Sequence, residues 1–372
     1  MSKIFAHRRR SLLKAIRMSD ADALLVTNET NVTYLTGFTG DSTWLLVSPG
    51  GTLAVSDGRY TTQLQEQCPD VEAFIRKTGT KLAEETGTLL DDLVKQTGKA
   101  TVGVESGSIT FAAVEALRGN STRAELVSTE GLVEDLRMIK DESEVAAIRE
   151  AVRLNEAGFD YLVNRLTSES TEIGLAHDLE HCLRQFGGAG FSFPAIIGVD
   201  DRAALPHYSP GDVRVGQASL VLVDWGTRGR SGYISDLTRT IVSDHPPKKL
   251  SDVYEAVREA NEAGIAAIRP GATGVEVDAA ARNVLEERGL EKWFTHSLGH
   301  GVGLNVHEAP SLGPTSPHTL EAGMVVTVEP GVYIPGRIGV RIEDDVLVTE
   351  DGCEVLSSLP KDIDAYSHAL AR

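Results

Sequence analysis

The stretch SLVLVDWGTRGRSGYISDLTRTIV, residues 219–242, decides the architecture of the second half of this 372-residue chain. Its two arms are nearly continuous apolar runs, which are typical of strands buried on both faces. The glycine-containing segment 228–232 between them predicts a β-hairpin. If the turn centres on Arg230, antiparallel pairing places Asp224 opposite Asp236 on one face of the sheet. A buried pair of like charges is costly, so this hairpin requires an explanation for its two acids.

A second hairpin repeats this arrangement. The stretch MVVTVEPGVYIPGRIGVRIEDDVLV, residues 324–348, again has two apolar arms that each carry an acid. A turn centred on Gly336 places Glu329 opposite Glu343. One interpretation is that the acids of both hairpins pair with Arg239 and Arg341. The repetition of the geometry favours the other interpretation, in which cations lie between the carboxylates.

Histidines gather in HSLGHGVGLNVHE, residues 296–308. Four carboxylates and one imidazole suit two divalent metal ions, and Mn²⁺ fits this oxygen-rich set best, with Co²⁺, Fe²⁺ or Zn²⁺ as alternatives. Periodicity alone does not choose between His296 and His300 as that imidazole. The step from His300 to His307 is odd, so a regular strand would point them to opposite faces. The glycines between them predict a bulge and an irregular backbone.

The composition limits the partners, the cysteine chemistry and the location that the chain can have. The chain is 41% apolar and 24% charged, as in an ordinary globular protein, and its net charge of −18 argues against a nucleic-acid or anionic-membrane partner. Its three cysteines are widely spaced, which indicates a reducing compartment without disulfides or a cysteine-based zinc site. The basic N-terminus is interrupted by charges and predicts an amphipathic helix, and no apolar run is long enough to span a membrane. We therefore expect a cytoplasmic protein.

The pattern along the chain predicts two domains, 1–134 and 135–372. The first alternates strands and helices as a small α/β domain, with a hairpin over 43–57. The second opens on a long amphipathic helix over 136–163 and contains two helices followed by a hairpin, twice. The two halves show no evident sequence likeness, so the repeat is expected to be structural. Further helices are expected over 172–186, 251–268 and 274–288. The last of these begins with a capping box of Thr273 and Glu276. Further strands are expected over 191–199 and 296–307.

Ordered motifs along the chain resemble a known family. VDWG…GYISDLTRT, HSLGHGVGLNVHE, VEPGVY and GVRIEDD resemble the metallopeptidases of the aminopeptidase P, prolidase and methionine aminopeptidase group. NVTYLTGFTGDSTWLLVS and VSDGRY resemble the N-terminal domain of the proline-specific branch, which creatinase shares. The resemblance implies an α+β fold. Its catalytic part is a pita-bread domain, a pseudo-two-fold curved antiparallel sheet covered by helices, and its N-terminal part is a smaller α/β domain.

The resemblance also implies roles for single residues. The metal ligands would be Asp224, Asp236, His300, Glu329 and Glu343. Asp236 and Glu343 would bridge two metal ions, and Glu329 would also transfer protons. The interval from Asp224 to Asp236 is one residue longer than is usual in the family, which puts their predicted pairing in doubt.

The resemblance also implies which residues contact the substrate. His207, in LPHY, and His307 would contact the substrate carbonyl and the developing oxyanion as catalytic and binding residues. His296 would line the substrate pocket. Arg341 would orient a ligand carboxylate beside the bound substrate, as residues behind metal ligands commonly do.

The function implied is a two-metal exopeptidase that cleaves the bond between an N-terminal residue and proline. A metal-bridging hydroxide would be the nucleophile, and the partners would be short proline-containing peptides and further copies of the chain in a homodimer or tetramer. Dipeptides (prolidase) and longer peptides (aminopeptidase P) remain open. The alternatives are a hydrolase or lyase of a small non-peptide, osmolyte-like substrate, and a catalytically silent binding protein. A phosphate loop and a serine hydrolase are disfavoured, because neither G-x-G-x-x-G before a helix nor G-x-S-x-G occurs.

Overall fold

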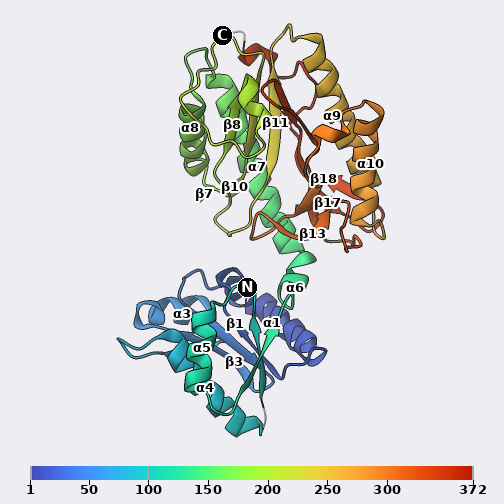
Figure 1. Cartoon of the computed structure of the whole chain (residues 1–372). Coiled ribbons are helices and arrows are strands. Elements are labelled where there is room, and N and C mark those ends of the chain that lie inside the picture. The colour runs from blue at the N-terminus through green and yellow to red at the C-terminus, as the bar shows by residue number, and fades with distance from the viewer. Residues whose placement is uncertain (1, 99, 371–372) are drawn as a thin grey trace. The chain divides into compact units, whose positions relative to one another are not determined.

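The structure is a computed structural model that describes residues 2–98 and 100–370. The chain divides into two compact units, Met1–Arg137 and Met138–Arg372 (Figure 1). We call them the N-terminal unit and the C-terminal unit, and describe each by itself.

The N-terminal unit is built on a six-stranded mixed sheet with the strand order β4-β3-β2-β1-β5-β6. The hairpin predicted over 43–57 is confirmed, because β2 and β3 pair antiparallel up to Ser48 and Gly51. The strands are β1 (Ala23–Val26), β2 (Trp44–Ser48), β3 (Gly51–Ser56), β4 (Glu72–Ile75), β5 (Thr101–Glu105) and β6 (Glu125–Thr129). The helices are α1 (Ser2–Arg17), α2 (Glu29–Thr36), α3 (Thr61–Gln67), α4 (Leu82–Thr97), α5 (Phe111–Asn120) and α6 (Glu134–Met138).

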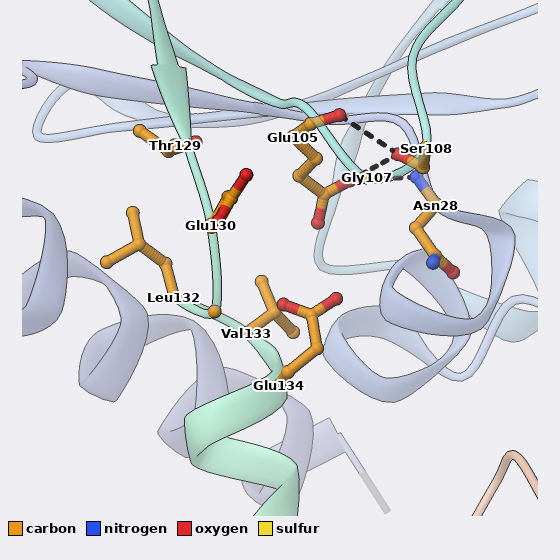
Figure 2. Close-up of a pocket in the computed structure, with 10 residues that line it drawn as sticks. Asn28, Glu105, Gly107, Ser108, Thr129, Glu130, Leu132, Val133 and Glu134 are labelled. Carbon is orange, nitrogen blue, oxygen red and sulfur yellow. Dashed lines mark hydrogen bonds between the residues drawn. The ribbon is translucent and has the colours of Figure 1, made fainter. Parts of the chain in front are cut away.

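A cavity of about 320 Å³ lies in this unit where the parallel strands β1, β5 and β6 end. Figure 2 shows the carboxylate of Glu105 on its wall beside Asn28 and Ser108. Glu105 accepts hydrogen bonds from the backbone amides of Thr27 (2.6 Å) and Asn28 (2.8 Å), where α2 begins. Burial raises the pKa of Glu105. All residues lining this cavity belong to the N-terminal unit, and none of them is a predicted site residue.

The C-terminal unit contains two helix pairs. They are α7 (Glu142–Arg165) with α8 (Glu172–Gln185), and α9 (Lys248–Ala267) with α10 (Gly274–Glu287). The predicted continuous helix over 136–163 is wrong, because α6 ends at Met138 and α7 begins at Glu142. Asp141 caps α7 and forms a capping box with Glu144, and such a cap starts a new helix.

The strands of this unit form two principal sheets and two short pairs. An isolated bridge between Thr238 and Glu343 joins the principal sheets. The predicted strand over 191–199 is wrong for 192–195, which separate two shorter strands. One sheet has the order β11-β9-β8, with β8 (Ile196–Val199), β9 (Leu220–Trp225) and β11 (Leu237–Val242). The other has the order β13-β12-β14-β17-β18, with β12 (Gly299–Gly301), β13 (Glu308–Leu312), β14 (Val325–Val328), β17 (Asp344–Val348) and β18 (Cys353–Val355). The short pairs are β15 (Gly331–Ile334) with β16 (Ile338–Arg341), and β7 (Gly190–Phe191) with β10 (Thr227–Arg228).

Strand β9 explains why the opening stretch is apolar at almost every position. Val221 and Val223 pack into the core that includes α7 and α8, whereas Leu220 and Leu222 pack into the core that includes α9 and α10. Figure 1 shows α8 and the α9–α10 pair on opposite sides of the strands. A strand covered on both faces has no polar face, so an acid such as Asp224 within it is buried.

In residues 2–98 and 100–370, no helix combines the length and the apolar character that a membrane crossing needs.

The predicted capping box of α10 is confirmed and gives a first test of stability. The Glu276 amide donates to Thr273 Oγ1 (3.2 Å), and the Thr273 amide donates to Glu276 Oε2 (2.8 Å). Thr273→Ala removes this cap and is expected to lower the free energy of unfolding by about 1 kcal/mol, whereas Thr273→Ser keeps the cap and most of the stability. Urea unfolding of the three proteins measures this difference, and equal stability of the Ala and Ser variants would contradict it.

Candidate metal centre

The first hairpin has a different register from the one predicted. Strands β9 and β11 pair Asp224 with Thr238, so the expected opposition of Asp224 and Asp236 is wrong. The turn centres on Ser231, since the Gly229 amide donates to the Tyr233 carbonyl (2.8 Å). Asp236 lies just before β11, two residues from Thr238. A shift of two residues conserves the face to which side chains point, and Asp224 and Asp236 therefore still reach the same site.

The second hairpin has the predicted register. β15 and β16 pair Gly331 with Arg341 around a turn centred on Gly336, and β14 and β17 pair Val328 with Asp344 in the same register. Glu329 and Glu343 thus fall opposite each other, in the interruption between these two ladders. Because of this interruption, the side chains of both acids need not follow the alternating directions of a regular strand.

The backbone that carries His300 is irregular, as predicted. The single strand expected over 296–307 is wrong, because β12 ends at Gly301 and the register with β13 shifts between His300 and Gly301. The glycines allow neighbouring backbones to approach closely. A Cβ at Gly299 would lie 2.0 Å from the Thr327 carbonyl oxygen, and one at Gly301 would lie 2.2 Å from the Ala309 carbonyl oxygen.

Four of the five predicted ligands lie close together. His300 Nε2 is 3.3 Å from Glu329 Oε1 and 4.0 Å from Asp236 Oδ2. Asp236, His300 and Glu343 each offer a ligand atom, and these atoms lie within 4.8 Å of one another. Asp224 is held nearby by an ion pair with Arg341. This donor set of carboxylate oxygens and one imidazole nitrogen suits divalent metal ions.

The electrostatics of these carboxylates also fit a cation. Burial, followed by the charges of neighbouring carboxylates, raises the pKa of Asp236 and of Glu343 well above the ordinary value. Asp224 Oδ1 is buried without a hydrogen-bond partner among residues 2–98 and 100–370. Burial alone would lower the pKa of His300, yet its hydrogen bond to Glu329 raises it. A group of acids that is buried this completely is stabilised when cations lie between its members.

A hydrogen-bond network behind the acids was not found from the sequence. Thr238 donates to Glu343 Oε2 (2.7 Å) and accepts from Arg341 Nε (3.1 Å). Arg341 also donates to the Tyr333 hydroxyl (2.6 Å), and its other nitrogen contacts Asp224. Thr238 stands two residues after Asp236 in a strand, and this spacing was the available signal. Tyr333 gave no comparable signal.

The alternative interpretation, in which the acids of the two hairpins pair with arginines, holds for one acid. Arg341 pairs with Asp224, whereas Arg239 pairs with Asp344 (2.7 Å), which is not a predicted ligand. Arg341 is 3% exposed, so it lies behind the carboxylates and not on the surface of the site.

Three predicted histidines surround this cluster. The His307 ring lies 4.4 Å from the His300 ring, and burial lowers the pKa of His307. His296 Nε2 lies 3.0 Å from the Tyr333 hydroxyl, and burial lowers its pKa as well. His207 is exposed in the loop after Ala204, close enough for its charge to act on Asp224, His296 and His307.

Comparison with protein families identifies the chain. The model of metallopeptidase family M24 matches residues 146–350, more than half of the chain. The chain belongs to metallopeptidase family M24. The creatinase/prolidase N-terminal domain matches residues 8–139. The pita-bread fold with a creatinase-like N-terminal domain, expected from the resemblance, is therefore confirmed, and the M24 family implies divalent metal ions as cofactors.

Individual M24 relatives resemble the chain over nearly its whole length. It is 32% identical to a protein named Xaa-Pro dipeptidase from Pyrococcus horikoshii, over 95% of this chain and 97% of that protein. It resembles the solved Xaa-Pro dipeptidase from Bacillus anthracis with a TM-score of 0.91 and 36% identity, over 96% of this chain and 99% of the other. The X-Pro aminopeptidase from Thermotoga maritima matches with a TM-score of 0.84 and 31% identity, over 94% and 99%.

Removal of one buried charge tests the electrostatics of the centre. In metal-free protein, a carboxyl whose pKa is raised by folding stabilises the fold at low pH, and this stability is lost as the pH rises toward the folded-state value. Asp236→Asn cannot ionise, so its stability relative to the parent should increase with pH, by up to about 1.4 kcal/mol per pH unit. Urea unfolding in a chelator, at a series of pH values that rises from the ordinary pKa of an aspartate, measures this trend. A constant or shrinking difference would contradict it.

Proposed function

We propose that this M24 peptidase is an Xaa-Pro peptidase that removes the residue preceding proline, with dipeptides as the favoured substrates. The cluster of Asp224, Asp236, His300, Glu329 and Glu343 carries the proposal, because it provides the donors for a hydrolytic metal centre. Relatives named Xaa-Pro dipeptidase and X-Pro aminopeptidase both support the proline specificity. The dipeptidase has the higher TM-score and identity, which favours dipeptides.

The cluster would hold two divalent ions. Asp224, Asp236, His300, Glu329 and Glu343 would supply the donors that hold them. Mn²⁺ suits the four carboxylates best, and Co²⁺, Zn²⁺ or Fe²⁺ are alternatives. When bound, such ions activate water and polarise the scissile carbonyl group. We also propose that the protein is a homodimer or tetramer and that it is cytoplasmic.

The residues around the cluster would then complete the reaction. Glu329 Oε1 accepts a proton from the attacking water and delivers it to the proline nitrogen as the bond breaks. His307 and His207 donate hydrogen bonds to the carbonyl oxygen as negative charge develops on it. His296, fixed by the Tyr333 hydroxyl, forms part of the wall of the substrate pocket. A bond to proline has no N–H to bind, so a shaped pocket of this kind would replace that contact.

A small peptide panel tests the substrate. After removal of metal by a chelator and addition of Mn²⁺, we expect release of free proline from Ala-Pro and slower cleavage of Ala-Pro-Ala. Ala-Ala serves as the control without proline. Cleavage of Ala-Pro-Ala alone would make the protein an aminopeptidase P. If metal-loaded protein left every Xaa-Pro peptide intact, the peptidase proposal would give way to a small non-peptide substrate.

The role of His307 is tested by kinetics. His307→Ala removes one donor to the carbonyl oxygen, and we expect kcat to fall about 100-fold or more with a smaller change in KM. The matched control is His181→Ala, which changes an exposed histidine on α8. Equal kcat values for the two variants would remove His307 from the mechanism.

A further inference from the structure

The tetrapeptide Asn-Glu-Ala-Gly occurs twice in the C-terminal unit, once in the first helix of each half. In α7 it begins at Asn155, thirteen residues after Glu142, where this helix starts. In α9 it begins at Asn261, thirteen residues after Lys248, where that helix starts. The two halves, which lacked evident sequence likeness, therefore share this motif at equivalent positions.

Both asparagines are completely buried, and each binds the backbone beside a predicted metal ligand. Asn155 Nδ2 donates to the Trp225 carbonyl (3.0 Å), one residue after Asp224. Its Oδ1 accepts from Thr227 Oγ1 (2.7 Å), which fixes the orientation of the amide. The Thr227 amide in turn donates to Ser235 Oγ (3.2 Å), and Ser235 directly precedes Asp236. Asn155 thus binds the first arm of the hairpin directly and is linked to the second arm through Thr227.

Asn261 makes the equivalent contacts in the second half. Its Nδ2 donates to the Val328 carbonyl (2.9 Å) and to the Ile342 carbonyl (3.4 Å). These carbonyls belong to the peptide groups that lead into Glu329 and Glu343. Asn261 Oδ1 accepts from Lys361 Nζ (2.8 Å), which orients this amide.

The glycine of each motif lies where the helix packs closely against a neighbouring element. A Cβ at Gly158 would meet Leu183 of α8 at 2.6 Å, and one at Gly264 would meet Val328 of β14 at 3.0 Å. The motif thus combines a site of close approach with an amide one turn earlier on the helix.

We propose that Asn155 and Asn261 are a matched pair of positioning residues, each of which holds the carboxylates of one half of the metal centre. The inference rests on the proposed function, because it assumes that these carboxylates bind metal. The ligands lie where strand ladders end or are interrupted, and buried carbonyl groups there need other donors. An asparagine amide has two N–H donors, so Asn261 can bind one carbonyl in each arm. Removal of groups that orient metal ligands commonly lowers the metal affinity about 10- to 100-fold.

Metal affinity separates this role from a purely structural one. Asn155→Ala and Asn261→Ala are each expected to weaken Mn²⁺ binding to chelator-treated protein about tenfold or more in calorimetric titrations. The matched control is Asn31→Ala, another completely buried asparagine, which binds Glu105, Glu134 and Arg137 in the N-terminal unit. It should lower Tm without changing Mn²⁺ affinity.

Milder variants keep the test decisive if an Ala variant does not fold. Thr227→Val preserves shape but removes the hydroxyl that orients Asn155, and Lys361→Met removes the ammonium that orients Asn261. Each should fold and bind Mn²⁺ several-fold more weakly than the parent. Affinities within twofold of the parent in the folded variants, with Tm lowered as in Asn31→Ala, would overturn the proposal. Failure of the parent itself to bind Mn²⁺ would instead reject the metal centre on which the proposal rests.

Discussion

The gathering of four carboxylates in one place, three of them buried and Glu329 half-buried, is the constraint on which the rest of the C-terminal unit depends. Asp224, Asp236, Glu329 and Glu343 repel one another in a region that water screens little, and the raised pKa values of Asp236 and Glu343 express this cost. Protein groups offset only part of it, through Arg341 at Asp224 and His300 at Glu329. A site that remains this acidic after its internal pairing is suited to divalent cations, which membership of the M24 family implies as cofactors.

The fold serves this constraint by placing three of the four acids where regular structure stops, whereas Asp224 lies within β9. Asp236 precedes β11, and Glu329 and Glu343 occupy the interruption between two ladders. Such positions allow side chains to converge from both sheets, but they also leave backbone groups that need partners. The long helices α7 and α9 supply these partners from Asn155 and Asn261. The two-fold organisation of the unit therefore extends from its helices to individual hydrogen bonds behind the ligands.

Much of this arrangement could be predicted from the sequence, and the exceptions have physical causes. The turn at Gly336 was predicted correctly because apolar runs of similar length flank it. The turn of the first hairpin was misplaced by one residue, because the segment 228–232 offers several centres and periodicity does not choose among them. The odd step from His300 to His307 correctly predicted an irregular backbone. The helix break at Asp141 was missed because a favourable N-cap interrupted an otherwise continuous apolar period. Thr238 and the paired asparagines were missed, because neither the spacing of Thr238 from Asp236 nor the repeated Asn-Glu-Ala-Gly specifies a contact until the fold is known.

Crystals soaked in Mn²⁺ show whether the five converging side chains hold two metal ions. Anomalous difference maps collected near the manganese edge locate the ions without reference to activity. We expect two peaks enclosed by Asp224, Asp236, His300, Glu329 and Glu343, with Asp236 and Glu343 between them. A single peak, or peaks elsewhere while these five side chains bind no metal, would contradict this expectation.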